Sequence, residues 1–479
     1  MTASRDQTRS AAEVIEALPW RWSVHGRIVL VGALGLVFDG WSVVVAGYVL
    51  PLLSHDWRLS TVELGLFGAI GLAGMAAGAF GWGLAADVIG RKRVFILTIL
   101  VYSIASLLCA VSPTFALLLV FRFIEGAGLG GCLPVDYALI SEFTPLKLRG
   151  RVVALLGMAF PLGATLCGIV STALLPVQSW RLLLAVLIVP AFLSVWARKD
   201  VPESPLFLIR RGRHEEARRV VDDLVRRTGG AVVEWDERSD RREPPSPGIG
   251  RRVAQVWTFD WKLTLTVWLL FIGVFFLYYG ALNWMPSILV ESGFGRYSAF
   301  LNTTLMTGVG IASVVLSAWL VERVGRKLSV LAGGVFSVAG IILFSVLLGN
   351  DVMAIVWLSV YGFAVQLLIS VIYVYVPEVY PTLLRGTGFG VASAISRVAA
   401  AAAPLLLGGV MFPVLGLVGT FSAVSIAVGL ALVLLLLFGP ETRGRALAVP
   451  NTPHRSAGPS TSAVLSSDHN RRRRPGKAQ

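Results

Sequence analysis

Two short charged loops of similar sequence, each set between long apolar runs, constrain this chain more than any other feature. The first covers residues 83–93 (GLAADVIGRKR), and the second, half a chain further on, covers residues 321–327 (VERVGRK). Each flanking run is long enough to cross a bilayer, which takes about 20 apolar residues. A charged turn between two such runs forces a helical hairpin whose tip lies in water. The repetition of this hairpin predicts a membrane protein built from two similar halves.

Two further repeats set the halves in the same register. The pattern E-x-x-P-x-x-x-R-G begins at Glu142 and again at Glu378, and the pair Pro-Glu occurs at residues 202–203 and again at residues 440–441. The separation between the two copies is nearly the same for all three repeats. Transporters built from repeats hold their ligands near the midplane, between the repeats. The sequence therefore predicts a substrate cavity between two six-helix halves.

The predicted fold is all-α, with twelve membrane spans in two pseudo-symmetric bundles. The spans lie near 28–50, 62–86, 94–112, 115–139, 152–176, 181–197, 263–289, 299–321, 328–348, 353–376, 387–411 and 414–438. The corresponding domains are a tail (1–27), an N-terminal bundle (28–197), a linker (198–262), a C-terminal bundle (263–438) and a disordered basic tail (439–479). Within the linker, an amphipathic helix is expected from about Gly212 to Arg227.

Charge and cysteine content indicate the location. Only 15% of the residues are charged, against about 25% in a soluble domain. The net charge of +14 could indicate nucleic-acid binding, but only Arg58, Arg181 and Arg296 fall in loops placed outside. The basicity therefore predicts cytoplasmic termini in a plasma-membrane protein, with affinity for anionic lipid. All three cysteines lie within spans, which excludes a disulfide framework. We expect a monomer with no cofactor, metal or nucleic-acid partner.

The first charged loop resembles the major facilitator superfamily, whose signature is G-x-x-x-D-x-x-G-R-K/R. Residues Gly83, Asp87, Gly90, Arg91 and Lys92 match it fully, whereas the second copy has Ala318 and Glu322 in place of the Gly and Asp. The resemblance implies that these loops act as gate latches. The implied gating residues are Asp87, Gly90, Arg91, Lys92, Glu142, Arg149, Glu322, Arg326, Glu378 and Arg385.

Three shorter motifs narrow the resemblance to branches of that superfamily. Residues 202–209 (PESPLFLI) and 440–444 (PETRG) are similar to marks of the sugar porters, and residues 130–135 with 141–145 resemble nicotinate-type metabolite transporters. Residues 39–42 (DGWS) resemble the Asp-Gly-x-Asp of aromatic-acid:proton symporters, with Ser42 in place of the second acid. These branches imply a transported metabolite and a proton as the coupling ion.

Acidic residues within spans 1 and 4 are the candidates for proton coupling. Charges at membrane depth cost about a few kcal/mol or more, so they face a cavity or one another. Asp39 is the single carboxylate near the middle of span 1, and Arg122 and Glu125 share a face of span 4, where they can pair. Asp136 lies further along span 4, on the same face of the helix as Arg122 and Glu125. We expect Asp39 and Arg122 to couple the proton, with Glu125 in support. The alternatives are a purely structural ion pair and an aspartate that only braces helices.

Arg397 is the strongest single candidate for binding substrate. It lies in the middle of span 11, and spans 7 to 12 contain no acidic residue away from their ends. A guanidinium at that depth needs an anion, and a carboxylate fits its planar fork. This arginine also resembles the span-11 arginine of organic-anion transporters. The alternative is a structural arginine that caps backbone carbonyls.

Aromatic and amide side chains on spans 7 and 10 are candidates to surround the ligand. The span-7 segment 278–286 (YYGALNWMP) resembles a Tyr-Gly-x-x-x-Trp-x-Pro segment of the same branches. From it we expect Tyr279, Asn283 and Trp284 to frame a flat ring, with Gln366 and Tyr373 of span 10 as further candidates. Ordinary helix packing with interfacial aromatics is the alternative.

The sequence thus predicts a proton-coupled importer of a small organic anion, an aromatic or heteroaromatic carboxylate such as nicotinate or benzoate. Quinate or a larger metabolite is not distinguished. The alternatives are a proton-driven multidrug or metabolite exporter, a sugar or polyol symporter, and a nutrient sensor that binds ligand without transport. None of these alternatives is an enzyme.

Overall fold

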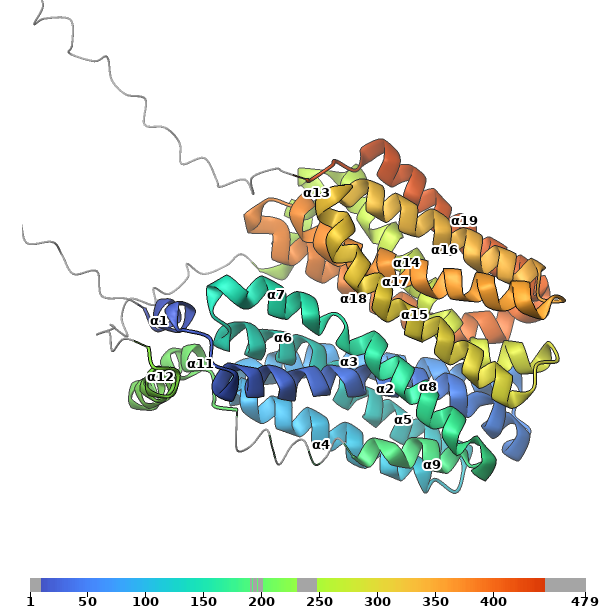
Figure 1. Ribbon diagram of the computed structural model, residues 1–479, viewed down its shortest axis with the longest axis horizontal. Coiled ribbons are helices and arrows are strands. Elements are labelled where there is room, and N and C mark those ends of the chain that lie inside the picture. The colour runs from blue at the N-terminus through green and yellow to red at the C-terminus, as the bar shows by residue number, and fades with distance from the viewer. Residues whose placement is uncertain (1–9, 190–191, 193–195, 197–200, 231–247, 444–479) are drawn as a thin grey trace, which may run out of the picture.

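The computed structural model describes residues 10–189, 192, 196, 201–230 and 248–443, and these form an all-helical protein. Figure 1 shows two bundles, with the blue to green helices in one and the yellow-green to red helices in the other. Within the described ranges, nine helical stretches are long and apolar enough to cross a membrane. Breaks divide other predicted spans into shorter helices, so the twelve predicted spans are consistent with this architecture.

The N-terminal bundle has helices at its first five predicted spans, whereas residues 190–191, 193–195 and 197 of the sixth lie outside the described residues. Ser60 and Glu63 form a capping box that begins the second long helix, since each satisfies a backbone N–H of the other. The predicted fourth span is broken at Gly131, and the fifth is broken at residues 157–158. The helices are α2 (Arg27–Trp57), α3 (Thr61–Ile89), α4 (Arg91–Ala110), α5 (Phe115–Gly130), α6 (Cys132–Phe143), α7 (Leu146–Leu156), α8 (Ala159–Leu174) and α9 (Trp180–Ala185).

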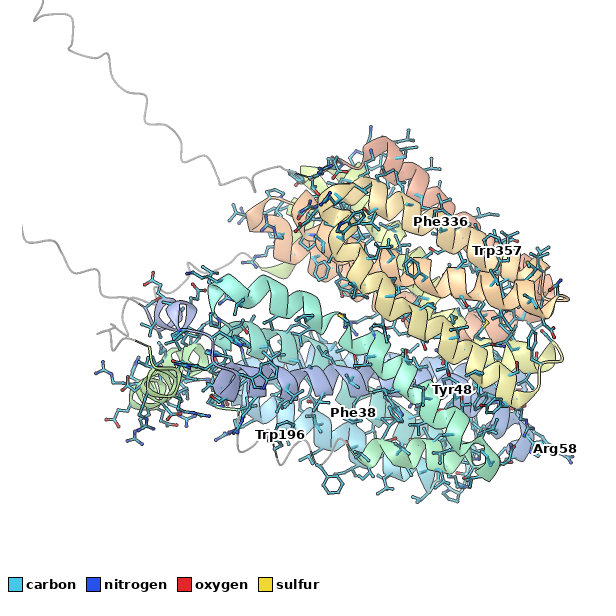
Figure 2. The ribbon with its side chains drawn as sticks, viewed as in Figure 1. Phe38, Tyr48, Arg58, Trp196, Phe336 and Trp357 are labelled. Carbon is cyan, nitrogen blue, oxygen red and sulfur yellow. The ribbon has the colours of Figure 1, made fainter. Side chains whose placement is uncertain are left out.

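The C-terminal bundle contains longer helices, of which the last is kinked at Gly416, where the backbone is not helical. They are α14 (Trp261–Glu291), α15 (Arg296–Arg323), α16 (Arg326–Val346), α17 (Asp351–Val379), α18 (Thr382–Leu406) and α19 (Phe412–Phe438), with a π-helical turn at Leu407–Met411. Large apolar side chains cover its outer surface, as Phe336 shows with 58% of its area exposed (Figure 2). Exposed apolar side chains of this kind are expected where a helix faces lipid rather than water.

Short helices cover the charged end of the N-terminal bundle. The predicted polar tail contains α1 (Ala11–Ala17), which packs with α11 (Pro205–Arg210) and α12 (His214–Thr228) through Val14, Ile15 and Val221. Glu16 of α1 also pairs with Arg149 at 3.0 Å. The predicted amphipathic helix is α12, whereas α13 (Ile249–Phe259) was not predicted. Residues 444–479 of the predicted basic tail lie outside the described residues.

The two bundles contact each other along the part of their helices that is remote from the charged loops. Tyr48 of α2, labelled in Figure 2, shares a hydrogen bond of 2.9 Å with Thr304 of α15. Arg296 at the start of α15 donates to Gln178 of the other bundle. These contacts hold the bundles together on one side of the central cavity.

Candidate functional site

A cavity lies between the bundles and is lined by both of them. It contains about 380 Å³ of empty space, part of it open to solvent. α3 contributes Leu72 and Met75, and the other lining residues come from α14, α17 and α18: Phe275, Tyr279, Tyr373, Ser393, Ser396, Arg397 and Ala400. The predicted position of the cavity agrees with this arrangement.

Aromatic rings form one wall of this cavity. Phe275 and Tyr279 lie one turn apart on α14 and stack with their centroids 6.1 Å apart. The ring of Tyr373 meets Phe275 edge-on at 6.2 Å. Rings arranged in this way offer both faces and edges to a further ring, which gains from offset or T-shaped contact. The wall therefore suits a flat, unsaturated ligand.

Arg397 supplies the positive charge of the cavity. Its side chain is half-buried, and within the described part of the chain it has no hydrogen bond or ion pair. Its charge acts on Tyr279 and Tyr373, and also on Asp39 of the other bundle. An unpaired guanidinium that opens into a cavity can bind a planar anion through two parallel N–H groups.

Asp39 is the acid on which Arg397 acts, although it does not itself line the cavity. It is fully buried in α2, and neither of its carboxylate oxygens has a hydrogen-bond partner among the described residues. A buried carboxylate without a donor is costly at membrane depth. A guanidinium that lines the cavity from one bundle thus acts electrostatically on a buried carboxylate of the other bundle.

Arg122 pairs with Glu125, as their spacing predicted. Its guanidinium donates to Glu125 at 2.8 Å and to the backbone oxygen of Ser42 at 3.0 Å. The Ser42 hydroxyl also donates to Glu125, at 2.7 Å. An acid at position 42 would place a second negative charge next to Glu125. The serine found there instead donates a hydrogen bond to the Glu125 carboxylate. Glu125 thus neutralises Arg122 in this structure, and no hydrogen bond or ion pair joins Arg122 to Asp39 in the described chain.

The remaining predicted ligand residues are spread over several places. Asn283 lines a second cavity together with Arg122, and its Oδ1 is buried without a partner in the described chain. Trp284 does not line the main cavity. Its indole N–H instead donates to the backbone oxygen of Pro404, at 2.9 Å. Gln366 lines a third cavity, within the C-terminal bundle. Of the five predicted partners of Arg397, only Tyr279 and Tyr373 share its cavity.

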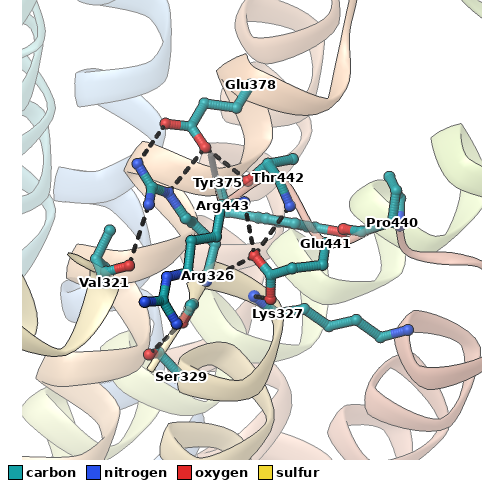
Figure 3. A network of polar contacts seen from close by, with 11 residues as sticks. Val321, Arg326, Lys327, Ser329, Tyr375, Glu378, Pro440, Glu441, Thr442 and Arg443 are labelled. Carbon is teal, nitrogen blue, oxygen red and sulfur yellow. Dashed lines mark hydrogen bonds and ion pairs between the residues drawn. The ribbon is translucent and has the colours of Figure 1, made fainter. Parts of the chain in front are cut away.

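The second charged loop forms a network within the C-terminal bundle (Figure 3). Arg326 binds both carboxylate oxygens of Glu378, at 3.0 and 3.2 Å. Thr442 donates to the same carboxylate at 2.6 Å. Bidentate pairing of this kind fixes orientation as well as charge. The loop therefore ties α16 to α17 and to the segment that follows α19.

The first charged loop repeats this arrangement in the N-terminal bundle. Arg91 forms an ion pair with Glu142, which is the counterpart of the pair between Arg326 and Glu378. Gly90 and Gly325, which precede α4 and α16, have φ angles of 102° and 110°. Only glycine adopts such a backbone without strain.

The other predicted gating residues do not share one pattern of contacts. Arg149 contacts α1, as described, and Arg385 donates to the Pro377 oxygen at 2.9 Å. Glu322 is exposed and forms no ion pair within the described ranges. Lys92 contributes its backbone N–H to the network, and the side chain of Asp87 lies outside the described residues.

Two acids that complete these networks were not predicted as site residues. Glu203 accepts the backbone N–H groups of Arg91 and Lys92, at 3.0 and 3.1 Å, and Glu441 accepts those of Arg326 and Lys327 in the same way. Each carboxylate therefore caps a helix N-terminus. Burial raises the pKa of Glu441, but the backbone donors outweigh it and hold the pKa below its ordinary value. The repeated Pro-Glu pair was the signal that could have identified them.

Comparison with known proteins agrees with this architecture. The family model described as "Sugar (and other) transporter" matches residues 27–451. The niacin transporter NiaP of Acinetobacter baylyi is 34% identical over 424 residues, covering 88% of this chain and 95% of the relative. The benzoate transport protein of the same organism is 26% identical over 422 residues, covering 86% and 89%.

A solved structure shows the same fold. The xylose transporter XylE from E. coli, in a partially occluded inward-open conformation, superposes with a TM-score of 0.73 at 20% identity. The match covers 89% of this chain and all of that chain. The family model and the niacin transporter relative place the chain among transporters and not among enzymes. The chain belongs to the sugar (and other) transporter family of the major facilitator superfamily.

Proposed function

We propose that this protein is a proton-coupled symporter that takes up a small aromatic or heteroaromatic carboxylate. The observation that carries the proposal is Arg397, a guanidinium that has no anion within the described chain and lies beside an aromatic wall. In the bound state the substrate carboxylate supplies the missing negative charge, and its ring packs against Phe275, Tyr279 and Tyr373. Relatives named as transporters of niacin and of benzoate support this choice, because both compounds are flat rings that carry a carboxylate.

Asp39 is the proposed proton carrier. Arg397 of the other bundle acts on it electrostatically, and a proton is the simplest partner for a buried carboxylate that accepts no hydrogen bond from the described residues. A substrate carboxylate bound at Arg397 neutralises a positive charge that acts on Asp39, and uptake of a proton by Asp39 accompanies substrate binding in this scheme. The coupling role expected of Arg122, with Glu125 in support, stays a prediction, because in this structure the two residues pair with each other and contact Ser42 of α2.

Binding and accumulation assays test the function. Purified protein is titrated with nicotinate, benzoate, quinate and the matching amides while its melting temperature is followed. At least one aromatic acid should raise the melting temperature, and its amide should not. The same acid should accumulate in proteoliposomes only when an inward proton gradient is imposed. Accumulation of amides or sugars in place of acids would contradict the proposal, and efflux of varied hydrophobic cations would favour an exporter.

The proposed orientation places both termini and residues 198–262 in the cytoplasm. It rests on the Lys and Arg asymmetry, since only Arg58, Arg181 and Arg296 fall in the predicted outside loops. Fusions of a cytoplasm-active reporter to either terminus should be active, and fusions of a periplasm-active reporter should be silent. A terminus found outside would invert the assignment of every loop.

A further inference from the structure

A second buried acid lies close to Asp39 and is not used by the scheme above. Asp136 of α6 is fully buried, and neither of its oxygens has a hydrogen-bond partner in the described chain. A methyl group added at Gly35 of α2 would meet Asp136 Oδ2 at 2.7 Å and the ring of Phe95 at 3.5 Å. The absence of a side chain at Gly35 is what admits the carboxylate to this position. Gly35 precedes Asp39 by one turn, a rise of about 6 Å toward the charged loops.

A tyrosine hydroxyl is buried beside the two acids. Tyr102 of α4 follows Phe95 by two turns on the same face, is fully buried, and has a hydroxyl without a partner among the described residues. Its electrostatic neighbours are Asp39, Asp136 and Cys132. Tyr137 is a further titratable group that Asp136 acts on. The described residues thus place two carboxylates and a phenol together, with Arg397 acting only on the Asp39 side.

Two carboxylates that share one dry site cannot both be ionised without a cation between them. No lysine, arginine or histidine in the described ranges forms an ion pair with either acid. A proton needs only one oxygen on each acid, whereas a sodium ion would need a fuller shell of oxygen ligands. The chemistry of the cluster therefore favours a proton.

We propose that Asp136 is a second proton-binding carboxylate, which shares one proton with Asp39 and receives it when Asp39 ionises. The transfer breaks an O–H bond on Asp39 and forms one on Asp136, so no other reactant is needed. Because Asp136 lies beside Gly35, on the charged-loop side of Asp39, the proton moves toward the end proposed to face the cytoplasm. This relay rests on the proposed proton symport.

Infrared spectroscopy of purified protein in lipid nanodiscs tests the shared proton without relying on transport. Wild type at neutral pH should show a carboxylic-acid C=O band that is lost in Asp39→Asn and also lost in Asp136→Asn. Asp56→Asn, an exposed acid near the end of the same helix α2, is the matched control and should keep the band. Tyr102→Phe should shift the band by removing its hydroxyl neighbour.

Two results would overturn the proposal. A band that Asp39→Asn removes and Asp136→Asn leaves intact would assign the proton to Asp39 alone. A wild-type band that disappears in sodium chloride but not in choline chloride would make the pair a sodium site.

Measurement of proton flux together with substrate flux separates this proposal from the symport itself. If wild type transports without proton flux while the band behaves as expected, the shared proton stands, and the symport fails together with the transfer of that proton toward the cytoplasm.

Discussion

Arg397→Ala should weaken binding of a carboxylate substrate by roughly 10- to 150-fold, the effect of losing a charge-assisted hydrogen bond of about 1.5–3 kcal/mol. The reason is that Arg397 has no anion of its own within the described chain, so the substrate carboxylate is its partner. Arg397→Lys keeps the charge but loses the planar fork, and should fall between wild type and Arg397→Ala. Isothermal titration of each purified variant measures the affinities.

The matching amide is the control that separates ligand contact from structure. An amide analogue should bind wild type poorly and should lose little more in Arg397→Ala. Arg251→Ala, an exposed arginine on α13, should leave both affinities unchanged. If acid and amide lose affinity equally in Arg397→Ala, the arginine braces the bundle, and the exporter alternative becomes the better explanation.

Asp39→Asn should abolish proton-driven accumulation, so that substrate only equilibrates across the membrane. Asparagine has nearly the same shape but cannot exchange a proton, and therefore the gradient has no group to act on. Exchange of labelled for unlabelled substrate should continue, because it needs the cavity but no net proton movement. Proteoliposome uptake with and without an imposed gradient measures both activities.

Asp56→Asn serves as the control for this experiment too, since Asp56 is an exposed acid on the same helix. It should accumulate substrate like wild type. Accumulation by Asp39→Asn at the wild-type level would remove Asp39 from the mechanism. Loss of exchange as well as accumulation would instead indicate that Asp39 shapes the cavity.

Local sequence rules predicted much of the fold and part of the site. Apolar runs located the long helices, and the spacing of Arg122 and Glu125 along one helix predicted their ion pair. In all three repeats the second copy follows the first after nearly the same number of residues, which predicted a cavity between two halves. The one-turn spacing from Phe275 to Tyr279 places both rings on one face of α14, although only Tyr279 was identified.

Contacts between distant segments could not be predicted in this way. Trp284 was expected to face the ligand, but its partner is the backbone oxygen of Pro404, on another helix. The docking of α1 depends on α12, which follows the whole N-terminal bundle in the chain. The hydroxyl of Ser42 completes the pair of Arg122 and Glu125 from a different helix, and no local pattern records that contact.

The carboxylate caps at Glu203 and Glu441 make each half self-sufficient at its charged loop. Each cap follows the last span of its own half, and it binds the first residues of that half's third long helix. A six-helix half that ends after this acid therefore contains the carboxylate that caps its own charged loop, and neither half depends on the other for this cap. What the two halves form only together is the cavity between them, which α3 lines from one half and Arg397 from the other.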